Sequence, residues 1–148
     1  MRLLLLAALV VAVAAPARAQ LGFIPMAGYD IDYEAPMVGL GFEIGLTPGI
    51  LPFVAALRPS AEYVFVENVD LFRVNGDLIG RFGAPGVPFA PYGKAGVGVE
   101  FSSPEGGESH TYVGANLGAG LEYNRFLVEG TLGIGDISSA RVAVGYRF

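Results

Sequence analysis

The fold is decided by residues 140–148, which read ARVAVGYRF and alternate strictly between two kinds of side chain. Successive side chains of a β-strand point to opposite faces. One face therefore carries Val142, Val144, Tyr146 and Phe148, and the other carries Arg141 and Arg147. In a soluble protein the apolar face would fill a core. An apolar face that ends in an aromatic residue and is backed by arginines is typical of a strand with lipid outside and a polar lumen inside.

The first residues follow the three-part pattern of a secretory signal peptide. Arg2 precedes an apolar run over residues 3–15, and Ala17-Arg18-Ala19 provides small residues before the expected cleavage site at Gln20. This run is shorter than the ~20 residues that a membrane-spanning helix needs. We therefore predict a signal peptide over residues 1–19 and an outer-membrane β-barrel domain over residues 20–148.

The composition narrows the function classes. Without Arg2 and Arg18, seven basic residues face fourteen acidic ones, so the mature chain carries a net charge of about −7, which disfavours nucleic-acid binding. The chain has no cysteine, which excludes a disulfide framework, a thiolate metal site and a lipoprotein anchor. No cofactor is expected. The mature chain also has no apolar stretch long enough for a spanning helix, and a closed barrel is then the remaining way to cross a bilayer.

Period two recurs along the mature chain, and no segment shows a convincing helical period. The expected strands cover residues 22–30, 37–46, 53–66, 69–82, 89–101, 111–123, 126–134 and 140–148. Turn residues separate them, as at Thr47-Pro48-Gly49, Ala84-Pro85-Gly86 and Asn124-Arg125. Strands of this length suit a tilted membrane crossing. The predicted fold class is all-β, an eight-stranded antiparallel up-and-down transmembrane β-barrel.

Charged residues and glycines share one face of these strands. The interior of an eight-stranded barrel is only just wide enough for side chains, so glycines there make room for long charged ones. We predict a charge-balanced lumen network of Glu43, Arg58, Glu62, Arg73, Asp77, Arg81, Lys94, Glu100, Glu122, Glu129, Arg141 and Arg147. Folding the strands as hairpins puts Glu62 opposite Arg73. It also lines up Glu43, Arg58, Asp77 and Lys94 across four adjacent strands.

The termini of an even-stranded barrel lie on the periplasmic side, so the connections 31–36, 67–68, 102–110 and 135–139 are expected to face outward. The remaining acids all fall in or beside these loops: Asp30, Asp32, Glu34, Glu67, Asp70, Glu105, Glu108 and Asp136. Asp30, Asp32 and Glu34 alternate, so in a strand they would share one side. They are a weak candidate for a divalent cation that bridges lipopolysaccharide phosphates; solvated loop acids are the simpler interpretation.

Three stretches carry a family resemblance: residues 91–98 (PYGKAGVG), 116–120 (NLGAG) and 144–148 (VGYRF). With the leader and the eight alternating segments, they make the chain similar to the small outer-membrane β-barrel family, which includes the OmpA transmembrane domain and OmpX. The resemblance implies an integral outer-membrane location among outer-membrane lipid and lipopolysaccharide. It also implies that the barrel assembly machinery reads the last strand through Val142, Val144, Tyr146 and Phe148. We expect a monomer.

Glu108, Ser109 and His110 form the only cluster with the ingredients of a hydrolase. Lipid A deacylases of the PagL type resemble this chain in size and use Ser, His and Glu, but with one residue between His and Ser. Here Ser109 directly precedes His110, so the two side chains point to opposite sides of an extended strand. We therefore expect a solvated loop and no catalytic residues.

Three functions stay open at this point. The first is a structural or envelope-integrity role for a barrel whose lumen is filled by the charge network. The second is a narrow outer-membrane channel or conduit for small solutes, since the lumen glycines could leave a gap. The third is a secreted soluble barrel of the lipocalin kind, in which the apolar face would point inward, because alternation alone does not say which face lies inside.

Overall fold

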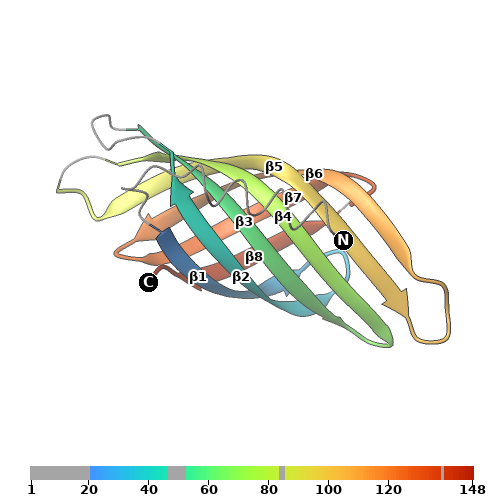
Figure 1. The fold of residues 1–148 in the computed structure, drawn as a ribbon. Helices are drawn as coiled ribbons and strands as arrows, with labels where there is room; N and C mark the ends of the chain where they lie inside the picture. Colours follow the sequence, from blue (N-terminus) through green and yellow to red (C-terminus); the bar gives the residue numbers. More distant parts are fainter. Residues whose placement is uncertain (1–20, 47–52, 84–85, 138) are drawn as a thin grey trace.

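A computed structural model describes residues 21–46, 53–83, 86–137 and 139–148. The expected signal peptide over 1–19, the turn Thr47-Pro48-Gly49, and Ala84 and Pro85 lie outside these residues. Eight strands form one closed barrel, in which each strand pairs antiparallel with the next and β8 pairs with β1 (Figure 1). The predicted fold class is confirmed. The strands are β1 (Leu21–Asp30), β2 (Ala35–Gly45), β3 (Phe53–Val66), β4 (Val69–Phe82), β5 (Phe89–Pro104), β6 (His110–Tyr123), β7 (Phe126–Gly135) and β8 (Ala140–Tyr146).

The two ends of the barrel differ. One end, here called the terminal end, holds Leu21, Phe148 and the tight turn Asn124-Arg125 (Figure 1). The other, called the distal end, holds the connections 31–34, 67–68 and 105–109 and the described residues 136, 137 and 139. Among the described residues there is no helix with the length and apolar character needed to cross a membrane.

Three predicted strand ends are wrong by two or three residues. β2 begins at Ala35, because Asp30 already pairs with it across a four-residue turn. β5 continues to Pro104, which pairs with Val69, so the connection to β6 spans five residues and not nine. β8 ends at Tyr146, although the Phe148 amide still donates to the Phe23 carbonyl at 2.9 Å.

The strand register matches the prediction between β2 and β3 and between β3 and β4. Gly41 pairs with Ser60 and Ile44 with Leu57, which is the register that sets Glu43 against Arg58. Glu62 lies opposite Arg73, and Arg58 lies opposite Asp77. Asp77, however, lies opposite Gly96, two residues from the predicted Lys94. The ladder between β4 and β5 starts at Arg81 and Tyr92, so this connection uses more residues on the β5 side than the symmetric hairpin that the prediction assumed.

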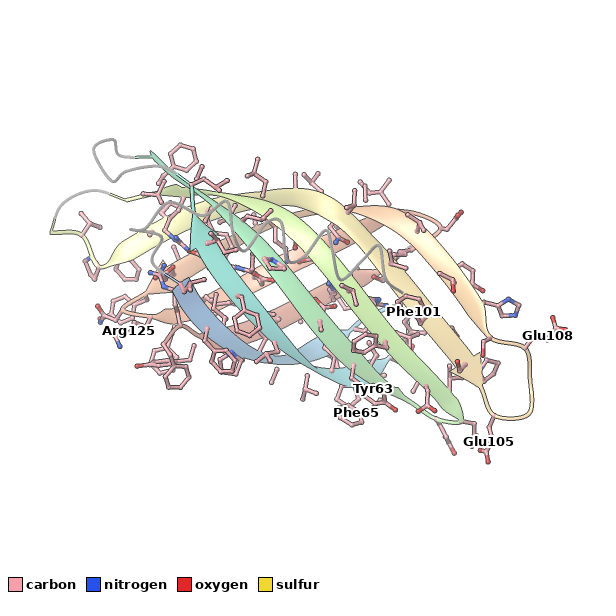
Figure 2. All side chains as sticks on the ribbon, viewed as in Figure 1. Tyr63, Phe65, Phe101, Glu105, Glu108 and Arg125 are labelled. Atoms are coloured by element: carbon pink, nitrogen blue, oxygen red, sulfur yellow. The ribbon has the colours of Figure 1, made fainter. Side chains whose placement is uncertain are left out.

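The barrel is apolar outside and polar inside. Every strand presents a large apolar side chain that is 46–71% exposed (Figure 2); one from each strand in turn is Leu21, Phe42, Phe65, Leu78, Val97, Leu117, Val128 and Val144. The alternate positions are buried and largely polar or charged. This orientation contradicts the lipocalin alternative, which needs an apolar interior and an exterior that suits water.

Candidate functional site

The interior charged side chains are the candidate site. The structure buries eleven of the twelve residues predicted to face the lumen, and Arg147 is 31% exposed at the terminal end. The alternation of side chains along each strand places these residues in the interior, because each lies on the strand face opposite the exposed apolar residues. They form two clusters joined by a polar layer.

Glu43 on β2 is the centre of the terminal cluster. Its carboxylate accepts hydrogen bonds from Arg58 Nη2 at 3.0 Å and from both terminal nitrogens of Arg81 at 2.8 and 3.0 Å. Arg147 Nη1 adds a bond at 3.3 Å and also pairs with Glu122. The Arg81 Nε lies 2.9 Å from Glu122 Oε2, which closes a ring of ion pairs around the terminal end.

Glu129 on β7 is the second acceptor of this cluster. It accepts from Arg58 Nη1 at 2.7 Å, Lys94 Nζ at 2.6 Å and the Tyr92 hydroxyl at 2.7 Å. The Arg58 guanidinium, which also lies 5.3 Å from the centre of the Tyr92 ring, thus joins β2 to β7 across the lumen. Arg58 pairs with these two glutamates although its Cα partner on β4 is Asp77. The lumen is narrow enough for a guanidinium to reach the opposite wall, so register alone does not choose the partner.

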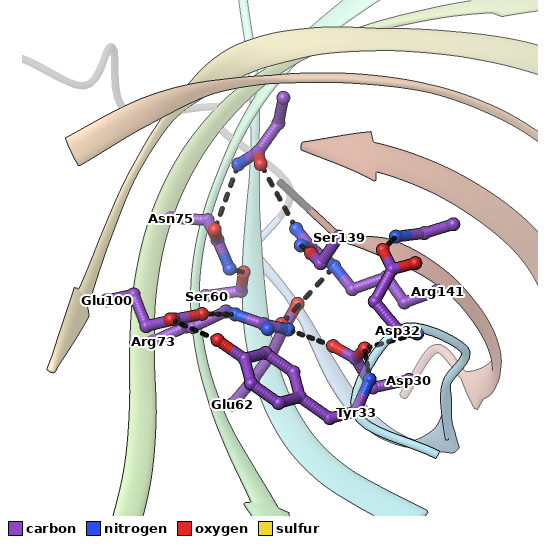
Figure 3. A network of polar contacts seen from close by, with 12 residues as sticks. Asp30, Asp32, Tyr33, Ser60, Glu62, Arg73, Asn75, Glu100, Ser139 and Arg141 are labelled. Carbon is purple, nitrogen blue, oxygen red and sulfur yellow. Dashed lines mark hydrogen bonds and ion pairs between the residues drawn. The ribbon is translucent and has the colours of Figure 1, made fainter. Parts of the chain in front are cut away.

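The distal cluster is built around Arg73 on β4 (Figure 3). Arg73 Nη1 donates to Asp30 at 2.7 Å and Nε donates to Glu100 at 2.6 Å, and all three side chains are almost completely buried. Glu62, its predicted partner, makes a longer contact, with Oε2 4.0 Å from Arg73 Nη1. The same oxygen lies closer to Arg141 Nε, at 3.4 Å.

Tyr33, in the distal connection 31–34, covers this cluster. Its hydroxyl donates to Glu100 at 2.9 Å, and its ring lies 5.6 Å from the Arg73 guanidinium (Figure 3). Desolvation, followed by the hydrogen bond to Glu100, raises the pKa of Tyr33 to about 12. The phenol therefore stays protonated and keeps donating its hydrogen bond over the neutral pH range.

A layer of amide and hydroxyl groups links the two clusters. Asn116 donates to Asn75 at 2.9 Å and to Asp77 at 3.3 Å, and its own oxygen accepts from Arg141 at 3.2 Å. Asp77 in turn lies 3.5 Å from Lys94 of the terminal cluster. Charge alone did not reveal the neutral members of the network. The alternation of the strands could have found those on inward strand faces, which are Ser60, Asn75, Tyr92 and Asn116; Tyr33 and Ser139 lie in connections and could not be found in this way.

The sequence predicted a charge-balanced lumen, but the interior of the described chain holds one acid more than it holds bases. Asp30, predicted to lie in or beside an outer loop, is fully buried and pairs with Arg73. It is the last residue of β1 and lies on the inward face, so the strand period places it with the lumen residues. Seven acids therefore face six bases in the interior.

The weak cation candidate is also corrected. Asp30, Asp32 and Glu34 do not share one side, because residues 31–34 form a turn. Asp30 closes that turn by accepting from the Asp32 and Tyr33 amides. Asp32 accepts from the Ala140 amide at 2.6 Å. No group of His, Cys, Asp or Glu side chains in the described part of the chain is arranged to hold a metal ion.

The Glu108-Ser109-His110 cluster forms no catalytic arrangement within the described residues. Ser109 Oγ lies 3.0 Å from Ser103 Oγ, and the His110 ring packs against Tyr112 at 6.2 Å between ring centres. A nucleophile and its base need a direct hydrogen bond, and none joins Ser109 to His110.

Long side chains occupy the space that interior glycines leave. A Cβ atom added at Gly41 would lie 3.5 Å from Arg58 Cγ, and one added at Gly118 would lie 3.1 Å from Lys94 Cγ. Some of the glycines that raised the possibility of a gap thus pack against charged residues, whereas a Cβ atom added at Gly45 would meet no atom within 4 Å.

The residues expected to form the assembly signal lie on the exterior at the C-terminal strand. Val142 and Val144 are exposed, and the Phe148 ring packs against Phe23 and Tyr146, with ring centres 6.1 and 4.8 Å apart.

Comparison with known proteins identifies the fold. No family model and no curated protein sequence matches the chain. Among solved structures, the N-terminal β-barrel domain of Pseudomonas aeruginosa OprF is 23% identical with a TM-score of 0.65, covering 88% of this chain and all of that one. The outer-membrane enzyme PagL is 13% identical (TM-score 0.56; 84% and 98% covered). Ail, the attachment invasion locus protein of Yersinia pestis, is 16% identical (TM-score 0.54; 86% and 95% covered). The chain therefore has the fold of the small eight-stranded outer-membrane barrels, as its sequence motifs had indicated.

Proposed function

We propose that this protein is an integral outer-membrane barrel with a structural role in the envelope and with a lumen closed by its ion-pair clusters. One observation carries the proposal: the exposed apolar residues surround the barrel on all eight strands, while the charges lie inside. Such a surface has no favourable contact with water, whereas a hydrocarbon layer solvates it. In this orientation the terminal end faces the periplasm and the distal end faces outward.

The interior contacts support a closed lumen. Arg58 bridges β2 and β7, and Arg73 bridges β1 and β5, so a guanidinium crosses the lumen at two levels. Conduction would require these buried pairs to separate, which would leave each charge without its partner in the interior. We further propose that the protein has no enzymatic activity, since the one cluster with hydrolase residues lacks the necessary contact.

The first test is a gel of fractionated envelopes that compares boiled with unboiled samples. A band in the outer-membrane fraction that migrates faster when unboiled would support a folded barrel in that membrane. A soluble protein with no such shift would refute the location.

The closed lumen is tested by single-channel recording in a planar bilayer. We expect no conductance steps from the wild-type protein. Reproducible steps, abolished by heat denaturation, would refute closure and establish the narrow-channel alternative.

A further inference from the structure

Lys94 is the only lysine in the sequence, against eight arginines. It lies on the inward face of β5, where its side chain is 3% exposed. A lysine amine is a nucleophile once it has given up a proton, whereas a guanidinium stays protonated and is not. Lys94 is therefore the one base of the interior that can form a covalent bond to a carboxyl group, and the five interior arginines cannot.

Asp77 differs from the other interior acids in its partners. Its Oδ2 lies 3.5 Å from Lys94 Nζ, and its Oδ1 accepts a hydrogen bond from Asn116 at 3.3 Å. The other six interior acids each lie within 4.0 Å of an arginine, and Asp77, within the described residues, does not. The one lysine and the one acid without an arginine thus meet on β4 and β5, which lie side by side (Figure 1).

A second carboxylate contacts the same amine. Glu129 Oε1 lies 2.6 Å from Lys94 Nζ, while Glu129 Oε2 accepts from Arg58 and from the Tyr92 hydroxyl, both at 2.7 Å. These two donors hold the Glu129 carboxylate in place and leave one oxygen for the lysine. Glu129 is therefore positioned to take a proton from the amine. Asp77 Oδ2, which makes no other polar contact among the described residues, is the oxygen that can leave.

We propose that the folded barrel forms an amide bond between Lys94 Nζ and Asp77 Cγ. The ammonium passes one proton to Glu129, and the freed amine attacks Asp77 Cγ. The Nζ–Cγ bond forms and the Cγ–Oδ2 bond breaks. Oδ2 leaves as water with two protons from the nitrogen, one of them carried by Glu129, which ends with the charge that it had at the start. The amide nitrogen keeps the third proton, so the reaction needs no oxidant, reductant or co-reactant.

The surroundings favour this condensation. Lys94, Asp77 and Glu129 are each at most 5% exposed, so bulk water does not reach them. A buried ammonium and a buried carboxylate each carry a large desolvation cost, whereas an amide carries no charge. The bond needs the folded barrel, because the two side chains meet only when β4 pairs with β5. A freshly refolded barrel therefore still holds the free ion pair. The membrane location plays no part in the reaction.

The first test follows the intact mass of the chain after it refolds from urea into lipid vesicles. We expect the full mass at the start and the loss of one water per chain with time, as well as the lower mass in barrel extracted from envelopes. After denaturation, a protease that cuts only after lysine should leave the linked chain whole, because Lys94 is its single site. A stable full mass and cleavage after Lys94 would overturn the proposal.

Digestion after arginine identifies the acid that reacts. Cleavage after Arg73 and Arg81 separates residues 74–81, which contain Asp77, from the segment 82–125, which contains Lys94. We expect these two peptides to stay linked. A link between 82–125 and 126–141 would instead assign the bond to Glu129 and overturn the choice of Asp77.

Variants separate the reactive groups from the fold. Lys94→Arg keeps the positive charge without a nucleophilic amine, so it should keep the full mass. Glu129→Gln removes the proton acceptor and should slow the loss of water by about 100-fold or more, as general acid–base catalysis contributes. Glu122→Gln is the matched control, because Glu122 pairs with Arg81 and Arg147 and with no lysine; it should react at the wild-type rate.

The unboiled gel shift shows which variants are folded. Loss of water at the wild-type rate in folded Glu129→Gln would overturn the role of Glu129 as proton acceptor. If the variants do not fold, the mass and the lysine cleavage of the wild-type chain still decide whether the amide exists. A folded barrel in the outer membrane with its full mass refutes this inference only, whereas a soluble protein refutes the proposed function.

Discussion

Replacement of Arg73 by methionine is the sharpest test of the interior network. Methionine keeps much of the length of the arginine side chain and removes its charge. It leaves Asp30 and Glu100, which Arg73 contacts at 2.7 and 2.6 Å, as buried carboxylates without their main partner. Loss of one partner of a buried pair costs about 3–5 kcal/mol, a large share of the 5–15 kcal/mol that stabilises a typical domain. We expect Arg73→Met to lower the free energy of unfolding by about 3–5 kcal/mol.

The assay is urea unfolding of the barrel in lipid vesicles. Far-UV circular dichroism and the unboiled gel shift suit this chain, because it contains no tryptophan. The control is Arg125→Met: Arg125 is exposed in the turn between β6 and β7, so its replacement should leave the unfolding midpoint unchanged. A loss of less than about 1 kcal/mol in Arg73→Met would refute the view that the cluster stabilises the barrel.

A rescue variant separates charge from packing. Asp30→Asn and Glu100→Gln, added to Arg73→Met, remove the uncompensated carboxylates while they keep the size of the side chains. If buried charge causes the loss, the triple variant is more stable than the single one, because neutral amides cost less to bury than carboxylates. A triple variant no more stable than Arg73→Met would show instead that the uncompensated carboxylates do not cause the loss.

Three further outcomes are expected. Asp77→Ala should lower the free energy of unfolding by only about 1–2 kcal/mol in the same urea assay, because Asp77 has two long contacts, at 3.3 and 3.5 Å. The pKa of Tyr33 rises on folding from 10.0 to about 12, so the stability that its phenol contributes is complete below pH 10 and is lost as the pH rises through 12; unfolding between pH 9 and 12 should show this loss in the wild type and not in Tyr33→Phe. Gly28→Ala should cost about 1–3 kcal/mol by thermal melting on unboiled gels, because a methyl group at Gly28 would press on the backbone of β8, while Gly130→Ala, with open space around it, should cost far less.

The features that depend on the two-residue alternation of side chains could be predicted from the sequence. Alternation placed eight strands, and the apolar C-terminal face indicated which side meets lipid. The position of Asp30 shows the limit of the loop assignment: the predicted strand already ended at Asp30, yet this residue was grouped with the outer-loop acids although the alternation of the strand puts it on the inward face. Tyr33 shows another limit. It lies in a connection, and the shape of the turn directs its side chain to the interior cluster. The alternation of side chains in strands says nothing about such a residue.

Partner choice could be predicted only in part, because it depends on the closed barrel as well as on neighbouring strands. Arg58 does pair with Glu43, against which the predicted hairpins set it, at 3.0 Å. Hairpin register correctly put Arg58 opposite Asp77, yet the guanidinium pairs with Glu129 on a strand 71 residues away in sequence. Which residues meet across a lumen depends on strand tilt and on the stagger at closure. A slip of two residues between β4 and β5 keeps every side chain on its face, so the charge pattern survives an error in register that changes the pairs.

The cross-lumen pairs have a particular consequence at the seam where the barrel closes. The ladder between β1 and β8 covers only Met26–Asp30 of β1, whereas that between β3 and β4 covers all of β3. In lipid, apolar contacts on the exterior offer no hydrophobic gain that would hold such a seam shut. The charges supply other attachments: Asp30 ties β1 to Arg73 on the far wall, and Arg147, just beyond β8, ties that end to Glu43. Both seam strands are thus anchored through the lumen. The buried charges therefore have a structural role at the seam that does not depend on the passage of a solute.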